Sequence, residues 1–138
     1  MLFRSALLVV TGPDAYVSPN WYPSKAEHGK VVPTWNYSLV HLRGVVRAVD
    51  DRGVLLDIVR RLTDRHESAQ TQPWSVDDAP ADYIDTQLRA IVGVEIAVTS
   101  VEGKAKLSQN RSDRDREGVR RGLAAGGPSQ QAVARAMG

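Results

Sequence analysis

The sequence contains no cysteine. Without cysteine the chain has no disulfide framework, no cysteine-ligated zinc or iron–sulfur site and no thiol nucleophile. Long apolar runs are missing too, because ALLVV and GVLLDIV fall far short of the roughly twenty residues that cross a bilayer. The first residues also lack the pattern of a secretory signal. These absences predict a soluble, cytoplasmic protein with no membrane partner.

Patterns that carry common chemistries are absent as well. The three histidines, His28, His41 and His66, form no HExxH motif and no pair spaced by four residues, so we expect no metal site. No GxSxG element frames a serine nucleophile. The sequence therefore indicates neither a metalloenzyme nor a serine hydrolase.

A length of 138 residues with 42% hydrophobic side chains predicts one domain. The net charge is only +2, but it is uneven, since eight basic residues against three acidic ones follow Gly103. Such a field attracts a phosphate-bearing cofactor or nucleic acid, whereas a solvated helix face with its own ion pairs is the alternative interpretation. The basic residues are Lys104, Lys106, Arg111, Arg114, Arg116, Arg120, Arg121 and Arg135.

Three strands are expected from β-branched and aromatic runs. Residues 5–10 predict a short buried strand that ends in a turn at TGPD, after which AYVS begins a new strand. Residues 33–50 predict one long strand, or two joined at Gly44. Alternation from residue 94 predicts a half-buried strand that continues toward residue 110.

Helices are expected between and after these strands. Asp50 or Asp51 caps a helix that ends near His66, and a second helix runs from Pro80 to Gly93. Ser112 or Asp113 caps a third, and residues 126–138 form a last turn or fray. Strands that cluster apart from helices indicate an α+β fold around an antiparallel sheet.

Residues 20–37 hold half of the eight aromatic side chains, namely Trp21, Tyr22, Trp35 and Tyr37. Aromatic rings stack on a planar ligand, and the lysines and hydroxyl groups in the same stretch are donors that a phosphate needs. The combination suits a phosphorylated aromatic cofactor. A packed, rigid loop of aromatic residues and prolines explains the composition equally well.

Four longer sequence motifs occur in order: AYVSPNWYPSKAEHGKVVPTWNY, LTDRHE, APADYIDTQLRAIVGVEIAVT and EGKAKLSQNRSDRDREGV. Together they resemble the successive signatures of the PaiB-type FMN-binding transcriptional regulators, from about Leu7 to about Leu123. The resemblance implies a split β-barrel of the pyridoxamine-phosphate-oxidase-like kind with flanking helices. It also implies a homodimer that holds FMN at the subunit interface.

The resemblance assigns site residues by position. It places Tyr16 and Val17 on the flavin-binding strand, and Ser24 with Lys25 in the turn that grips the FMN phosphate. Trp21 and Trp35 are alternatively dimer or core aromatics. The next strand, which lines the flavin ring or the ribityl chain, begins with Thr34, Trp35 and Asn36. The polar segment KLSQNR, residues 106–111, is expected to contact the cofactor or the partner subunit. Its candidate site residues are Lys106, Ser108, Gln109, Asn110 and Arg111.

The beginning of the sequence departs from the family pattern. Members of the family carry further barrel strands before the strand that corresponds to ALLVV, whereas only MLFRS precedes it here. We therefore expect a barrel that lacks its first strands. Residues 1–5 also match what a common sequencing adapter encodes after a start codon, which predicts that they are not native.

Three functions are open at this point. The resemblance implies a bacterial FMN-binding protein that acts as a negative transcriptional regulator. The same fold also hosts flavin-dependent oxidoreductases, so an enzyme is the first alternative. A nucleic-acid-binding module without a cofactor is the second. Because no helix-turn-helix is evident, any DNA contact is expected to use the basic C-terminal segment.

Overall fold

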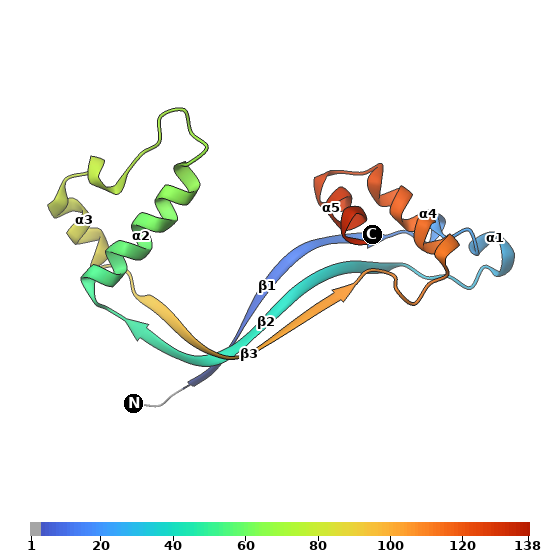
Figure 1. The fold of residues 1–138 in the computed structure, drawn as a ribbon, viewed down its shortest axis with the longest axis horizontal. Helices are drawn as coiled ribbons and strands as arrows, with labels where there is room; N and C mark the ends of the chain where they lie inside the picture. The colour runs from blue at the N-terminus through green and yellow to red at the C-terminus, as the bar shows by residue number, and fades with distance from the viewer. Residues whose placement is uncertain (1–3) are drawn as a thin grey trace. The chain divides into compact units, whose positions relative to one another are not determined.

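The computed structural model describes residues 4–138, so most of the predicted non-native segment 1–5 lies outside the described residues. Three strands carry the fold: β1 (Arg4–Val17), β2 (Thr34–Val49) and β3 (Gly93–Lys106). The helices, drawn with the strands in Figure 1, are η1 (Pro19–Trp21), α1 (Lys25–His28), α2 (Arg52–Glu67), η2 (Val76–Asp78), α3 (Ala81–Leu88), α4 (Asp113–Ala124) and α5 (Pro128–Ala136).

The strands form one antiparallel sheet in the order β1-β2-β3. With helices beside an antiparallel sheet, the predicted α+β class is confirmed. The predicted segment 33–50 contains a single strand, β2 (Thr34–Val49), so the alternative with two joined strands is wrong. The sheet of the described residues has three strands and does not close on itself. The split barrel therefore stays a prediction.

The predicted turn at TGPD is wrong, because β1 continues through Gly12 and Pro13 as one strand. Proline cannot donate a hydrogen bond to a neighbouring strand, and β1 lies at the edge of the sheet, where that donor is dispensable. Gly12 permits close approach to β2, since a Cβ atom there would lie 2.3 Å from the Ser38 hydroxyl oxygen. The edge position of β1 thus tolerates a sequence that usually signals a turn.

The predicted burial of two strands is also wrong. Side chains from Leu7 to Val10 stay exposed on both faces of β1, with Leu7 at 46% and Val10 at 49%. No side chain of β3 is buried, and Val94, Val98 and Val101 are all exposed. Their apolar pattern predicts core residues, but the described sheet has neither a further strand nor a helix to cover them.

Helix starts agree with the local signals. Asp51 caps α2 by accepting a hydrogen bond from the Val54 amide at 2.9 Å, and Ser112 caps α4 through the Asp115 amide at 3.2 Å. The second expected helix, α3, begins at Ala81 but ends at Leu88, five residues before Gly93. Residues 128–136 form helix α5 rather than a frayed end.

The chain divides into two compact units, and the single domain stays a prediction. The larger unit consists of Leu7–Arg43 with Thr99–Gly138, and the smaller unit is built around Gly44–Val98. In the smaller unit, α2, η2 and α3 meet through the buried residues Leu55, Val76 and Leu88. No helix within residues 4–138 combines the length and the apolar character needed to cross a membrane.

The larger unit holds the main core. In this unit α4 and α5 pack on one face of the sheet, against buried side chains of β1 (Figure 1). Because side chains alternate along a strand, the neighbours of these buried residues point to the opposite face. The core consists of Ala15, Val17, Tyr22, Val119, Leu123, Val133, Ala134 and Met137, with Trp21, Val31 and Leu107 at its margin.

Candidate functional site

All twelve predicted site residues lie in the larger unit. The polar segment KLSQNR, residues 106–111, packs against the aromatic segment 20–37 of the same chain, although Asn36 and Ser108 are 72 residues apart in sequence. Ser108 hydrogen-bonds Asn36, Lys106 hydrogen-bonds Thr34, and the Arg111 guanidinium lies 4.8 Å from the centre of the Tyr22 ring. The structure thus gathers into one region two segments that sequence patterns alone left apart.

Two aromatic rings stand exposed on the sheet face that α4 and α5 leave open. Tyr16 and Trp35 form an edge-to-face pair with ring centres 6.1 Å apart, and they are 45% and 53% exposed. Their neighbours Val17 and Asn36 are completely buried on the opposite face. Alternation along β1 and β2 therefore places the two rings on the same face of the sheet. Trp35, unlike Trp21, does not contact the core.

Two lysines of β3 lie beside residues of β2. The Lys106 ammonium donates to the Thr34 hydroxyl and, at 3.0 Å, to the Trp35 carbonyl oxygen. The Lys104 ammonium lies 5.7 Å from the centre of the Tyr37 ring. An ammonium group has three donors, so Lys106 keeps one for a ligand. This face combines flat apolar rings with positive charge, which is the chemistry that a phosphorylated aromatic molecule requires.

Three of the predicted residues point into the protein instead. Val17 belongs to the core, and the buried amide of Asn36 donates to the Ser108 hydroxyl at 3.0 Å. Ser108 has a φ of 63°, a left-handed conformation that is uncommon outside glycine. The Asn36–Ser108 hydrogen bond holds the start of β2 to the loop after β3. In this conformation these side chains support the site and do not reach the open face.

The predicted phosphate turn is tied to α4 by a buried carboxylate. The Ser24 amide and hydroxyl both donate to Asp115, at 3.1 Å and 2.9 Å, while the Lys25 ammonium donates to the Asn20 side-chain oxygen. Burial alone would raise the pKa of Asp115, but hydrogen bonds from Ser24 and Ser112 and the charge of Arg111 lower it overall. Asp115 is therefore an anion that occupies both Ser24 donors, which leaves Lys25 as the ligand-accessible part of this turn.

The last three residues of the segment 106–111 lie in different surroundings. The Gln109 side chain closes its own loop, donating to the Ala105 carbonyl oxygen at 2.8 Å and accepting from the Leu107 amide at 2.7 Å. Asn110 is exposed, and Arg111 covers Tyr22. No described contact directs Gln109 or Asn110 toward the open face, so their expected role against a cofactor or partner stays a prediction.

Sequence reasoning missed two features of this region. Asp115 follows Ser112 by three residues, and this spacing between a capping serine and an acidic residue is a recognised helix-start signal. Trp21 packs on α4 at Gly118 and Gly122, two glycines that share one helix face because they are spaced by four. Trp21 therefore packs at the margin of the core, against α4.

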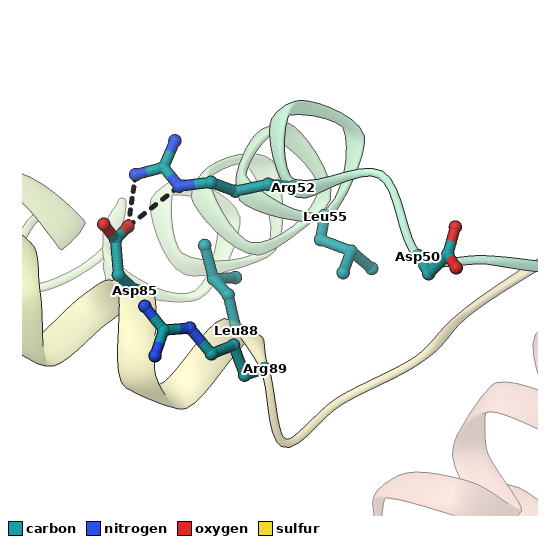
Figure 2. Close-up of a pocket in the computed structure, with 6 residues that line it drawn as sticks. All are labelled: Asp50, Arg52, Leu55, Asp85, Leu88 and Arg89. Atoms are coloured by element: carbon teal, nitrogen blue, oxygen red, sulfur yellow. Dashed lines mark hydrogen bonds and ion pairs between the residues drawn. The ribbon is translucent and has the colours of Figure 1, made fainter.

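A separate pocket lies in the smaller unit between α2 and α3 (Figure 2). Its buried base is Leu55 and Leu88, and its rim carries an ion pair in which the Arg52 Nε donates to Asp85 at 2.9 Å. Asp50 and Arg89 complete the lining. The pocket offers no aromatic ring and none of the predicted site residues, so it fits a planar cofactor less well than the open sheet face does.

Over residues 4–138, no three histidine, aspartate or glutamate side chains come together as a metal site. Asp14 and Glu102 lie on the same side of their strands as Tyr16 and Lys104, so the open face carries charges of both signs.

Comparison with known proteins identifies related chains. A family described as "Putative FMN-binding domain" matches residues 3–100. An uncharacterized protein of Aspergillus fumigatus is 36% identical over 135 residues, covering 85% of this chain and 51% of its own length. An uncharacterized protein of Emericella nidulans is 35% identical over 129 residues, covering 86% and 51% respectively.

A bacterial relative has a name. The "Protease synthase and sporulation protein PAI 2" of Bacillus subtilis is 31% identical over 112 residues, covering 81% of this chain and 51% of its own length. The chain spans about half the length of these curated relatives. The family match extends over β1, β2 and most of β3, including the exposed pair Tyr16 and Trp35. The predicted resemblance is therefore confirmed: the chain belongs to the FMN-binding domain family that includes PaiB-like proteins.

Proposed function

We propose that the chain binds FMN on the open sheet face of the larger unit. The observation that carries this proposal is the exposed edge-to-face pair of Tyr16 and Trp35, with a lysine ammonium at the Trp35 backbone. The isoalloxazine ring of FMN is planar and largely apolar, and its phosphate is a dianion near neutral pH. The aromatic side chains can stack on the planar ring, and the ammonium groups can bind the phosphate.

The residues present fit the cofactor with one restriction. Ring contacts fall to Tyr16 and Trp35, and the donors available to the phosphate are Lys106 and Lys25 rather than Ser24, whose donors face Asp115. Bound FMN supplies one- and two-electron redox chemistry. The chain's own contribution is to orient the flavin ring, neutralise the phosphate charge and shelter the stacked face from water.

For the whole protein we propose a regulatory role of the PaiB type, in a homodimer with a split barrel. The exposed apolar residues of β1 and β3 support a larger barrel, because strands with two open faces are normally covered. DNA contact through α4 has less support. Arg120 and Arg121 pair with Glu117, and Arg114 pairs with Glu27 at α1, so much of the basic charge is neutralised.

An oxidoreductase is the second candidate function. The specific observation in its favour is that α4 and α5 pack on the other face of the sheet, so the far side of a flavin ring bound at Tyr16 and Trp35 stays open to a second molecule. Oxidation of reduced nicotinamide by the flavin-loaded protein would support an enzyme. Flavin binding without such turnover would favour the regulatory role.

Replacing Trp35 with alanine tests the ring contact. We expect the dissociation constants of FMN and riboflavin to rise together by roughly tenfold to a hundredfold, since stacking on one aromatic ring is worth about 1–3 kcal/mol. Trp74→Ala is the matched control, because Trp74 is a similarly exposed tryptophan in the smaller unit. Fluorescence titration of both flavins measures the effect. An unchanged affinity in Trp35→Ala would remove the open face from the proposal.

Replacing Lys25 with alanine tests the phosphate contact. We expect FMN affinity to fall by about tenfold to a hundredfold while riboflavin affinity stays, because a charge-assisted hydrogen bond is worth about 1.5–3 kcal/mol and riboflavin has no phosphate. Lys30→Ala removes a nearby exposed lysine as a control. Equal losses for the two flavins would make Lys25 a structural residue.

A further inference from the structure

Ser108 is the only residue other than glycine, within the part of the chain that the structure describes, whose backbone is left-handed. Its φ is 63°, a conformation that few residues other than glycine adopt and that persists where surrounding contacts hold it. Ser108 is also buried, and it lies in the loop between β3 and α4, two residues after Lys106. Its contacts show what holds it in this conformation.

The side chain of Ser108 is paired with the side-chain amide of Asn36. The Asn36 nitrogen donates to the Ser108 hydroxyl at 3.0 Å, and the hydroxyl donates to the Asn36 oxygen at 3.2 Å. Asn36 is completely buried, and its nitrogen also lies 3.7 Å from the Met137 sulfur. Because both side chains are buried, water cannot replace these hydrogen bonds, and the two residues are held together.

The left-handed backbone at Ser108 folds the loop back on the end of β3. The next side chain, that of Gln109, accepts a hydrogen bond from the Leu107 amide at 2.7 Å and donates one to the Ala105 carbonyl oxygen at 2.8 Å. Leu107 and Ala105 flank Lys106 in the sequence. The loop that follows β3 therefore fixes the backbone that carries Lys106.

The Asn36–Ser108 contact joins the two parts of the proposed flavin site. Asn36 directly follows Trp35, the proposed ring contact, and Ser108 follows Lys106, a proposed phosphate contact, by two residues. On the open face the Lys106 ammonium donates to the Trp35 carbonyl oxygen at 3.0 Å. The start of β2 and the end of β3 are thus held together from both faces of the sheet.

We propose that Ser108 is a positioning residue for FMN, which sets the spacing between the Trp35 ring and the Lys106 ammonium through its left-handed backbone and its contact with Asn36. This inference rests on the proposed function. FMN has to meet both contacts at once, because its ring and its phosphate belong to one molecule. Riboflavin has the same ring and no phosphate, so its affinity depends on the ring contact alone. Ser108 therefore determines how much more tightly the chain binds FMN than riboflavin, without touching either.

Ser108→Gly in the full chain tests this role. Glycine adopts a φ of 63° without strain, so the substitution removes the hydroxyl and its contact with Asn36 while the loop conformation stays allowed. Fluorescence titration gives the dissociation constants of FMN and riboflavin, and their ratio measures the preference for FMN. We expect this preference to fall by roughly threefold to tenfold, which is part of the roughly tenfold to hundredfold that a complete charge-assisted contact provides. Riboflavin affinity should stay the same.

Two further variants show whether Ser108 acts through Lys106. Lys106→Ala should lower the preference for FMN at least as much, and the double variant Ser108→Gly/Lys106→Ala should lower it no further than Lys106→Ala alone. Ser129→Gly is the matched control. The Ser129 hydroxyl also joins two elements of the larger unit, because it donates to the Asp14 carbonyl oxygen at 2.7 Å, but it contacts neither Trp35 nor Lys106. This control should keep the preference for FMN.

A second route removes the same contact from β2. Asn36→Ala should also reduce the preference for FMN, and urea unfolding of each variant shows that it is folded under the conditions of the titration. Agreement between Asn36→Ala and Ser108→Gly would support the contact itself, since the two substitutions lie on different strands or loops. If Asn36→Ala is folded and keeps the full preference, the inference is wrong.

The results separate this inference from the proposed function. Equal losses for the two flavins in Ser108→Gly would make Ser108 a structural residue and overturn the inference. A preference that persists in Ser108→Gly and disappears in Lys106→Ala would also overturn it, while the phosphate contact would stand. If the unsubstituted chain binds FMN no more tightly than riboflavin, the phosphate contact of the proposed function is wrong, and the positioning role falls with it.

Discussion

Replacing Gly118 with alanine is expected to lower the free energy of unfolding of the larger unit by about 1–2 kcal/mol, the overpacking cost less the helix preference for alanine. A Cβ atom at this position would lie 2.1 Å from the Trp21 carbonyl oxygen and 3.0 Å from the Pro23 side chain. The first contact is with backbone, so the segment that carries Trp21 has to move. Overpacking of this kind usually costs about 1–3 kcal/mol and exceeds the gain of about 1 kcal/mol that alanine brings to a helix.

The displaced segment leads directly into the Ser24–Lys25 turn, so Gly118→Ala is also expected to weaken FMN binding. Gly103→Ala is the matched control, because nothing lies within 4 Å of a Cβ atom added there. Urea unfolding followed by far-ultraviolet circular dichroism measures both variants, and fluorescence titration measures their affinity for FMN. A common unfolding midpoint for the two variants would mean that Trp21 and α4 are not in close contact.

Signals that act within a few residues made parts of the fold predictable. Asp51 and Ser112 start helices by hydrogen bonds to amides three residues later, and this spacing is visible in the sequence. The region of the site was equally accessible, because Tyr16 and Trp35 belong to motifs that characterise the family. Such motifs do not show to which face of the sheet a side chain points. In the structure Trp35 is exposed and the next residue, Asn36, is buried.

Features that depend on sheet order or on distant partners were not predictable. Gly12 and Pro13 look like a turn unless the edge position of β1 is known. Leu7 and Val10 look like core residues, because a sequence does not state whether a covering layer is present. The partner of Ser24 lies 91 residues away at Asp115, and no local pattern links the two.

Asp115 also carries the second large effect, because Asp115→Ala leaves the Ser24 amide and hydroxyl without their acceptor. Ser24 is only partly buried, so its two donors can turn to water, and losing their acceptor should destabilise the larger unit by about 1–3 kcal/mol. The free energy of unfolding of Asp115→Asn is expected to lie between those of the unsubstituted chain and Asp115→Ala, since the asparagine amide oxygen accepts one of the two hydrogen bonds. Urea unfolding at neutral pH provides the comparison, with Asp113→Ala, an exposed acidic residue of the same helix turn, as control.

The dependence on pH identifies the carboxylate itself. The folded protein lowers the pKa of Asp115, so the charged form is favoured by folding. The sign of the effect follows: this stability is fully present above the unfolded pKa of about 3.9 and is lost as the pH falls through the lower folded pKa. Unfolding measured between about pH 2.5 and pH 6 should therefore show a decline on acidification that is smaller in Asp115→Asn than in the unsubstituted chain. Parallel curves for the two proteins would assign the acid sensitivity to other carboxylates and leave Asp115 without its anchoring role.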